Sequence, residues 1–168
     1  VIGDVKRGDI GSTAEAYSDF YLGDNDYSAA TDCITVNPYL GTDSLEPFLK
    51  NCHKNGKGVF ILVKTSNKSS VEIQDLVSNG KKICQYVADL VSELSRGSEG
   101  KYGYSSIGAV VGATFSRDAA ELRERMKRNY FLVPGYGAQG GTAEDAAACF
   151  NNDGLGALVN SSRGIIAA

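Results

Sequence analysis

The chain has 168 residues, of which 42% are hydrophobic and 22% charged, with a formal net charge of −3 at pH 7. This size and balance are typical of one folded domain, and the charge provides no field to attract nucleic acid or an anionic membrane. Without a recognisable signal peptide or an apolar run of membrane length, we expect a cytoplasmic protein with reduced thiols and no membrane partner. The cysteines and the single histidine lack metal-ligand spacing, so we predict no metal site and a surface role for His53; the cysteines are Cys33, Cys52, Cys84 and Cys149.

Short β-rich runs alternate with longer helical patterns, which is typical of parallel βα units. Several of these runs are continuously apolar, as strands are when both faces of a sheet are covered. The six runs that we predict as strands are residues 1–6, 33–37, 58–64, 107–112, 130–133 and 157–160.

The first two helices carry start signals and a 3.6-residue hydrophobic period. Ser12 and Glu15 are spaced as a capping box and predict the start of the first helix. Its predicted buried stripe consists of Tyr17, Phe20 and Tyr21. The second helix is predicted from an apolar stripe and ends at a glycine; these residues are Leu45, Phe48, Leu49, Cys52 and the pair Asn55-Gly56.

Four further helical patterns follow along the chain. A short helix is predicted around Ile73, Leu76 and Val77. A longer one is predicted from Ile83, Val87, Leu90 and Leu94, and another from Leu122 and Met126. The last covers residues 143–150 and is capped by Thr142 with Asp145. Residues 96–103 are predicted to be a flexible loop within one domain.

Strands followed by helices fit both a doubly wound sheet and a (β/α)8 barrel. Polar residues gather just after the strand ends, which favours the barrel, because barrel sites draw residues from the carboxyl ends of many strands. Six strands cannot close a barrel that typically needs ~250 residues. We therefore predict that residues 1–168 form a single partial (β/α)8 barrel domain, with strands 3 to 8 of eight, and lack two βα units and the last helix.

The opening segment contains an acid, a lysine and a second acid at the end of the first predicted strand. Asp4 and Lys6 share one face of a strand, whereas glycines follow and leave the direction of Asp9 open. One interpretation is a solvated edge strand with alternating charges. The other is a lysine held charged by carboxylates, each close pair contributing roughly 4 kcal/mol of gross attraction at a dielectric of about 20. A lysine so placed can deliver a proton.

A second group of polar residues follows the last two predicted strands. Residues 134–141 form a glycine-rich loop in which Gln139 adds a side-chain donor to inward-facing amides. Residues 160–164 offer hydroxyl groups and the guanidinium of Arg163, which can grip a phosphate bidentately. If the two strands are numbers 7 and 8 of a barrel, these loops occupy its usual phosphate site.

Taken together, these motifs resemble orotidine 5′-phosphate decarboxylase, and within it the longer-chain branch. The resemblance covers essentially the whole chain. The motifs that carry it are the run Asp4-Val5-Lys6-Arg7-Gly8-Asp9-Ile10-Gly11-Ser12-Thr13, the segments Asn37-Pro38-Tyr39-Leu40-Gly41 and Val63-Lys64-Thr65-Ser66-Asn67, the loop Pro134-Gly135-Tyr136-Gly137-Ala138-Gln139, and Arg163.

The resemblance implies decarboxylation of orotidine 5′-monophosphate to UMP without cofactor or metal. It implies that Asp4 faces the substrate carboxylate and that Lys6 protonates C6 of the pyrimidine. It also implies a homodimer, in which Asp9 and Thr13 serve the neighbouring active site. The substrate-binding residues that it implies are Ser66 with Thr65 at the pyrimidine, Gln139 and Arg163 at the phosphate, and Pro134 in the same loop.

The chain also departs from the family pattern. A further lysine and a ribose-binding aspartate are expected on strands preceding the first one here, and Lys64 does not align with either. We therefore expect the sequence to be part of a longer protein. Asn37 is either a residue of the pocket floor or a structural residue at a strand end.

Two alternative functions remain open from the sequence. One is a related sugar-phosphate decarboxylase or aldolase, which usually needs a divalent metal beside the same carboxylates. The other is a phosphate-binding domain without catalysis, which keeps Arg163 and the glycine-rich loop.

Overall fold

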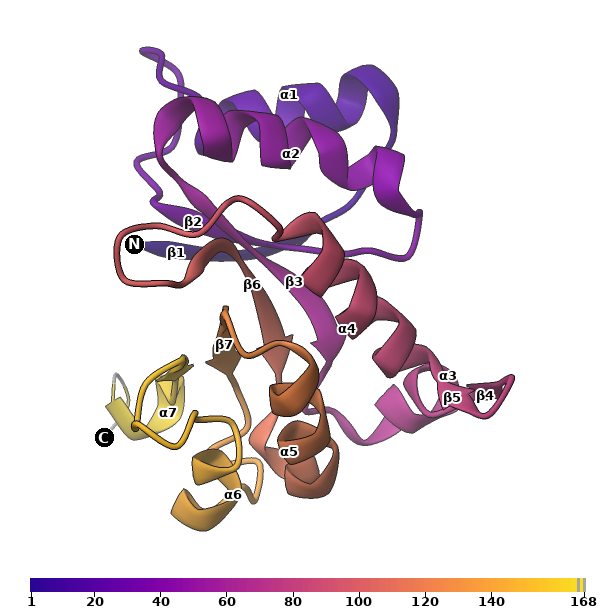
Figure 1. The fold of residues 1–168 in the computed structure, drawn as a ribbon. Coiled ribbons are helices and arrows are strands. Elements are labelled where there is room, and N and C mark those ends of the chain that lie inside the picture. Colours follow the sequence, from indigo (N-terminus) through magenta and orange to yellow (C-terminus); the bar gives the residue numbers. More distant parts are fainter. Residues whose placement is uncertain (166, 168) are drawn as a thin grey trace.

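Six parallel strands form one curved sheet in the computed structural model, which describes residues 1–165 and 167 (Figure 1). Their order in the sheet is β1-β2-β3-β6-β7-β8, the same as their order along the chain. A doubly wound sheet reverses its strand order at a switch point, whereas a barrel does not. The strand order therefore supports the predicted partial barrel. The strands are β1 (Ile2–Arg7), β2 (Cys33–Val36), β3 (Gly58–Lys64), β6 (Ser105–Val111), β7 (Asn129–Val133) and β8 (Ala157–Val159).

The helices that connect the strands cover one face of the sheet. The main core lies between this face and the helices, and Phe48, Ile61 and Phe131 are fully buried there. A second, smaller cluster on the other face consists of strand residues alone, centred on Phe60 and Val110. This second face is the one that a closed barrel would enclose. The helices are α1 (Gly11–Leu22), α2 (Thr42–Asn55), α3 (Val71–Gln74), α4 (Ile83–Leu94), α5 (Ser116–Arg125), α6 (Ala143–Ala147) and α7 (Ser162–Ile165), with 3₁₀ turns at Lys68–Ser70 and Ala113–Phe115.

The first helix differs from its prediction. Helix α1 begins at Gly11, so Ser12 lies inside the first turn and the predicted capping box with Glu15 does not form. Of the predicted stripe, Tyr17 and Tyr21 are partly buried against the core, but Phe20 is 50% exposed. The fully buried residues of the helix are Ala14, Ser18 and Leu22. The reason is the close packing of α1 beside α2, where the Ser18 hydroxyl donates to the Pro47 carbonyl at 2.8 Å (Figure 1).

The predicted short helix around Ile73, Leu76 and Val77 is confirmed only for Ile73. Helix α3 ends at Gln74, and a two-stranded hairpin follows, formed by β4 (Val77–Ser78) and β5 (Lys81–Lys82). Asn79 and Gly80 connect the two strands with positive φ angles of 49° and 75°. This pair is a strong signal for a tight hairpin turn, and it overrides the weak helical period before it.

The other helical predictions agree with the structure, except that the last helix, α6, is shorter than predicted. Helix α2 buries Leu45, Phe48 and Cys52 and ends at the left-handed Gly56, with His53 exposed in its last turn. The capping box of Thr142 and Asp145 forms, but α6 ends at Ala147, three residues earlier than predicted. All four cysteines are free thiols. Within the described part of the chain, no helix is long and apolar enough to cross a membrane.

Candidate active site

Asp4 and Lys6 form an ion pair at the carboxyl end of β1. The Lys6 ammonium donates to Asp4 Oδ1 at 2.6 Å, and both side chains are more than half exposed. Lys6 has a φ of 46°, which is rare for a side chain other than glycine. A residue from the next strand holds this geometry: the Thr35 hydroxyl donates to Asp4 Oδ1 and accepts from the Lys6 backbone N–H, both at 2.9 Å.

Sequence reasoning missed Thr35. Its side chain is fully buried at the end of β2, and it reaches both members of the Asp4–Lys6 pair. The signal available in the sequence was a hydroxyl residue within the otherwise apolar strand β2. The interpretation of the opening segment as a purely solvated edge strand does not account for this buried support.

The second acid of the opening segment lies apart from the pair. Asp9 Oδ1 accepts the backbone N–H of Ile10 at 2.9 Å, and Thr13 is exposed in the first turn of α1. Among the described residues, no ion pair joins Asp9 to Lys6. The structure therefore brings together Asp4 and Lys6, whereas Asp9 is bonded to the Ile10 backbone and Thr13 is exposed. The assignment of Asp9 and Thr13 to a neighbouring subunit stays a prediction.

A hydrogen bond connects the loop after β3 to the glycine-rich loop after β7. The Ser66 hydroxyl donates to Gln139 Oε1 at 2.8 Å, across 73 residues of sequence. Glycines permit this approach, because a Cβ on Gly112 would lie 2.7 Å from Ser66 Cα and one on Gly135 would lie 2.9 Å from Ser66 Cβ. Two of the predicted substrate-binding residues are thus adjacent.

The remaining predicted binding residues have different surroundings. Thr65 is bonded to α3, since its backbone N–H donates to Gln74 Oε1 at 3.0 Å. The Pro134 carbonyl accepts the Ala113 N–H at 2.9 Å. Arg163 is exposed on α7, two residues after Ser161, whose hydroxyl donates to the carbonyl of Tyr136 in the glycine-rich loop at 3.5 Å.

Asn37 has the structural role at a strand end, and its role in the floor of the substrate pocket stays a prediction. Its Oδ1 accepts the backbone N–H of Tyr39 at 3.0 Å, which closes a turn directly after β2. It also lines an open pocket of about 510 Å³ between the ends of β2 and β3 and helix α4, together with Leu62, Gln74 and Val87. Neither Asp4, Lys6 nor Ser66 lines this pocket.

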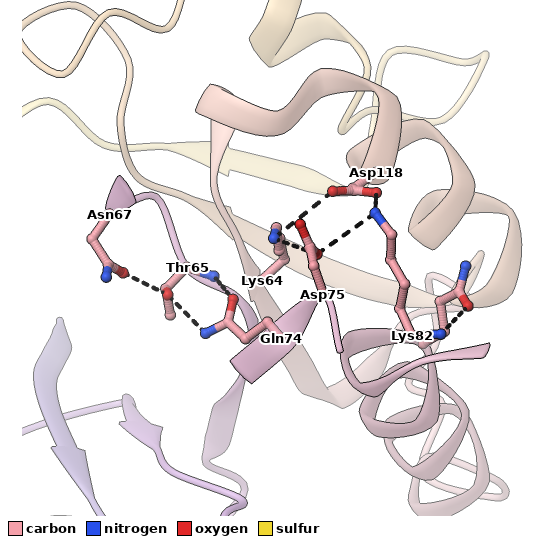
Figure 2. A network of polar contacts seen from close by, with 8 residues as sticks. Lys64, Thr65, Asn67, Gln74, Asp75, Lys82 and Asp118 are labelled. Atoms are coloured by element: carbon pink, nitrogen blue, oxygen red, sulfur yellow. Dashed lines mark hydrogen bonds and ion pairs between the residues drawn. The ribbon is translucent and has the colours of Figure 1, made fainter. Parts of the chain in front are cut away.

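A partly buried cluster of four charges lies beside the Ser66 segment, and sequence reasoning did not find it (Figure 2). Lys64 is fully buried and contacts both Asp75 and Asp118, and Lys82 contacts the same two carboxylates. Burial works to raise the pKa of Asp75, but its contacts with Lys64 and Lys82 outweigh burial and hold that pKa below its usual value. The hydrogen bond to Asp118 raises the pKa of Lys82. The available signal was a lysine at the end of an apolar strand.

Within the residues that the structure describes, no three His, Cys, Asp or Glu side chains are grouped as metal ligands. The fold and the position of the polar residues define the class of protein. A parallel barrel sheet carries an acid–lysine pair in the second half of β1 and a serine–glutamine contact after β3 and β7. Polar groups at the carboxyl ends of the strands are typical of (β/α)8-barrel proteins with a functional site. The model of the orotidine 5′-phosphate decarboxylase / HUMPS family matches residues 1–168, so the chain belongs to that family.

Individual relatives agree with the family match. A Rhodopirellula baltica protein named orotidine 5′-phosphate decarboxylase is 51% identical over 171 residues, covering 100% of this chain and 57% of the relative. The structure of Leishmania donovani UMP synthase is similar with a TM-score of 0.82 and 39% identity, covering 100% of this chain and 35% of that one. The structure of Leishmania donovani OMP decarboxylase has a TM-score of 0.80 and 36% identity, covering 100% and 61%. The chain therefore spans little more than half of its curated relative.

Proposed function

We propose that this chain is part of an orotidine 5′-monophosphate decarboxylase, which releases CO2 and forms UMP in pyrimidine synthesis without cofactor or metal. The observation that carries the proposal is the Asp4–Lys6 pair, held by the buried Thr35 at the same end of the sheet as the Ser66–Gln139 contact. Family membership supports the same substrate. We further propose that residues 1–168 form one partial barrel domain.

The proposed chemistry follows from the placement of these charges. In this proposal the Asp4 carboxylate faces the substrate carboxylate, and it holds the Lys6 ammonium by a hydrogen bond of 2.6 Å. As the bond from C6 to the carboxylate breaks, CO2 leaves and the electron pair stays on C6. Lys6 then transfers a proton to C6 and regains one from water. Fixed charges favour the developing carbanion because they need not reorganise during the reaction.

Binding of the rest of the substrate would involve the two loops that meet at Ser66. Its hydroxyl would bind the pyrimidine with Thr65 as its neighbour, while Gln139, Pro134 and Arg163 would surround the phosphate. The Ser66–Gln139 hydrogen bond of 2.8 Å links these two parts of the site. Binding energy from the remote phosphate would then help to order the loop and exclude water.

We also propose a cytoplasmic homodimer in which Asp9 and Thr13 complete the neighbouring site. The accessibility of these residues is consistent with this, because Thr13 is exposed and Asp9 is only half-buried, so a second subunit can reach both. Cross-complementation tests it. Mixing an Asp9→Ala subunit with a Lys6→Ala subunit should restore part of the activity that each variant lacks alone, since a mixed dimer has one intact site; no recovery would contradict the arrangement.

The test of the activity uses the full-length gene product and follows the loss of the orotate absorbance on decarboxylation. Lys6→Ala should abolish turnover, whereas Lys101→Ala should retain it, because Lys101 is exposed and lies over the ring of Tyr102. No turnover by the unmodified protein, or equal turnover by Lys6→Ala, would refute the proposal. Turnover that a chelator stops would favour a metal-dependent relative of the same superfamily instead.

A further inference from the structure

Four charged side chains form a closed, neutral ring at the end of β3 (Figure 2). The Lys64 ammonium lies 2.7 Å from Asp75 Oδ1 and 3.8 Å from Asp118 Oδ2. The Lys82 ammonium lies 2.6 Å from Asp118 Oδ1 and 3.6 Å from Asp75 Oδ1. Lys64 also lies 4.2 Å from the centre of the Phe115 ring. A fully buried ammonium is costly unless it is paired, so Lys64 depends on these partners for its position.

A β-bulge directs Lys64 into this ring. In the pairing of β3 with β6, Leu62 lies opposite Val110, but Lys64 lies opposite the next residue, Val111, so β3 contains one extra residue. Without the bulge, Lys64 would share a face with Leu62, on the side that a closed barrel encloses. With it, Lys64 turns to the helix side and meets Asp118 of α5. Bulges of this kind redirect side chains beside active sites.

The same bulge determines where Ser66 lies, two residues further along. A second contact runs parallel to the Lys64–Asp75 pair, because Gln74 accepts from the Thr65 N–H at 3.0 Å and donates to the Thr65 hydroxyl at 2.9 Å. Lys64 is thus bonded to Asp75, and Thr65 to the neighbouring Gln74. These contacts fix the backbone immediately before Ser66.

Close packing leaves the Ser66 backbone little freedom to move. The Gly112 N–H donates to the Lys64 carbonyl at 2.7 Å, and the Thr114 hydroxyl donates to the Ser66 carbonyl at 2.9 Å. A displacement of Lys64 would therefore shift the Ser66 backbone, whose hydroxyl contacts Gln139.

We infer that Lys64 and Asp75 are positioning residues, which hold the Ser66 hydroxyl in place against Gln139 without touching the substrate. This inference rests on the proposed decarboxylase function for its kinetic consequences. It assigns a role to a fully buried lysine that is paired with Asp75 and that the proposed chemistry does not use.

The kinetic test is a double-mutant cycle in the full-length gene product, built from Lys64→Met and Ser66→Ala. Lys64→Met should lower kcat/KM by about 10- to 100-fold, because a misplacement of about 1 Å has effects of this size. In the Ser66→Ala background the same change should lower kcat/KM by no more than about threefold, since its target is already absent. A purely structural role predicts equal effects in both backgrounds. The matched control is Lys81→Met, which removes the neighbouring pair with Asp89 and should leave kcat/KM unchanged.

A measurement independent of activity accompanies the cycle. Amide hydrogen exchange at Thr65 should be faster in Lys64→Met than in the unmodified protein or in Lys81→Met, because the Thr65 N–H bond to Gln74 loosens. If Lys64→Met does not fold, Asp75→Asn replaces it in this measurement, because Asn keeps the shape of the side chain and leaves Lys64 paired with Asp118. Amide hydrogen exchange at Thr65 should also be faster in Asp75→Asn.

The outcomes separate the two proposals. Faster exchange at Thr65 in a protein without decarboxylase activity would refute the proposed function and support the positioning role. An active protein with unchanged exchange at Thr65, or with equal effects of Lys64→Met in both backgrounds, would refute the positioning role alone.

Discussion

Thr35→Val removes one buried hydroxyl and keeps the shape of the side chain, so it isolates the support beneath the Asp4–Lys6 pair. Thr35 is fully buried, and its hydroxyl makes two hydrogen bonds of 2.9 Å, one to Asp4 Oδ1 and one from the Lys6 N–H. The Lys6 backbone, with its φ of 46°, loses its acceptor in the variant. We therefore expect a lower free energy of unfolding and a less fixed geometry of the Asp4–Lys6 ion pair.

The magnitude follows from these two contacts. An orphaned, partly buried N–H costs about 1 to 2 kcal/mol, and the lost bond to Asp4 costs about 1 kcal/mol, because water replaces it at an exposed carboxylate. The methyl group that replaces the hydroxyl returns about 0.8 kcal/mol of hydrophobic stabilisation. The net loss in the free energy of unfolding should therefore be about 1 to 2 kcal/mol.

Urea denaturation of the full-length gene product measures this loss, and the slope of the transition should stay constant. Thr42→Val is the matched control, because Thr42 is exposed at the start of α2 and should change stability by less than about 0.5 kcal/mol. If Thr35→Val is as stable as the control variant, the hydroxyl does not support the pair and the reasoning is refuted. Decarboxylation by Thr35→Val should also fall, since Lys6 loses its fixed direction.

Three further predictions concern packing, thiol reactivity and acid stability. Gly112→Ala should destabilise the protein by about 1 to 3 kcal/mol, as measured by urea denaturation, because its Cβ would lie 2.7 Å from Ser66 Cα. Native thiol titration with a disulfide reagent at pH 8 should modify at most Cys33, the half-buried cysteine, since burial raises the pKa of Cys52 to about 12. The free energy of unfolding should fall as the pH drops below about 4. The pKa of Asp75 lies below its usual value of 3.8 in the folded state, so its stabilising contribution is complete above 3.8 and disappears as the pH falls through the lower folded value.

Each of these predictions has a control and a contradicting result. Gly100→Ala places its Cβ 3.8 Å from the nearest atom and should be neutral, so equal effects of the two alanines would contradict the packing argument. Rapid modification of all four thiols in the native protein would contradict their burial. Asp75→Asn should flatten the pH dependence below pH 4, and an unchanged profile would assign that dependence to other carboxylates.

Much of the architecture was predictable, because it depends on local patterns. The apolar runs identified all six strands of the sheet, and their alternation with helices favoured a barrel. The capping box of Thr142 and Asp145 formed where its spacing predicted. The errors arose where a local signal competed with a stronger one. The Asn79-Gly80 turn replaced a weak helical period, and the packing of α1 against α2 left Phe20 exposed.

The candidate site also has a part that the sequence determines and a part that only the tertiary structure decides. The sequence by itself determined which residue types follow each strand, and hence the association of Asp4 with Lys6 and the polar loops around Ser66 and Gln139. Only the tertiary structure decided which of them touch, because those contacts join segments that are far apart in the chain. The buried support from Thr35 and the ring of charges around Lys64 also required it. A bulge of one residue reverses the face on which a side chain lies, and no period in the sequence records that reversal.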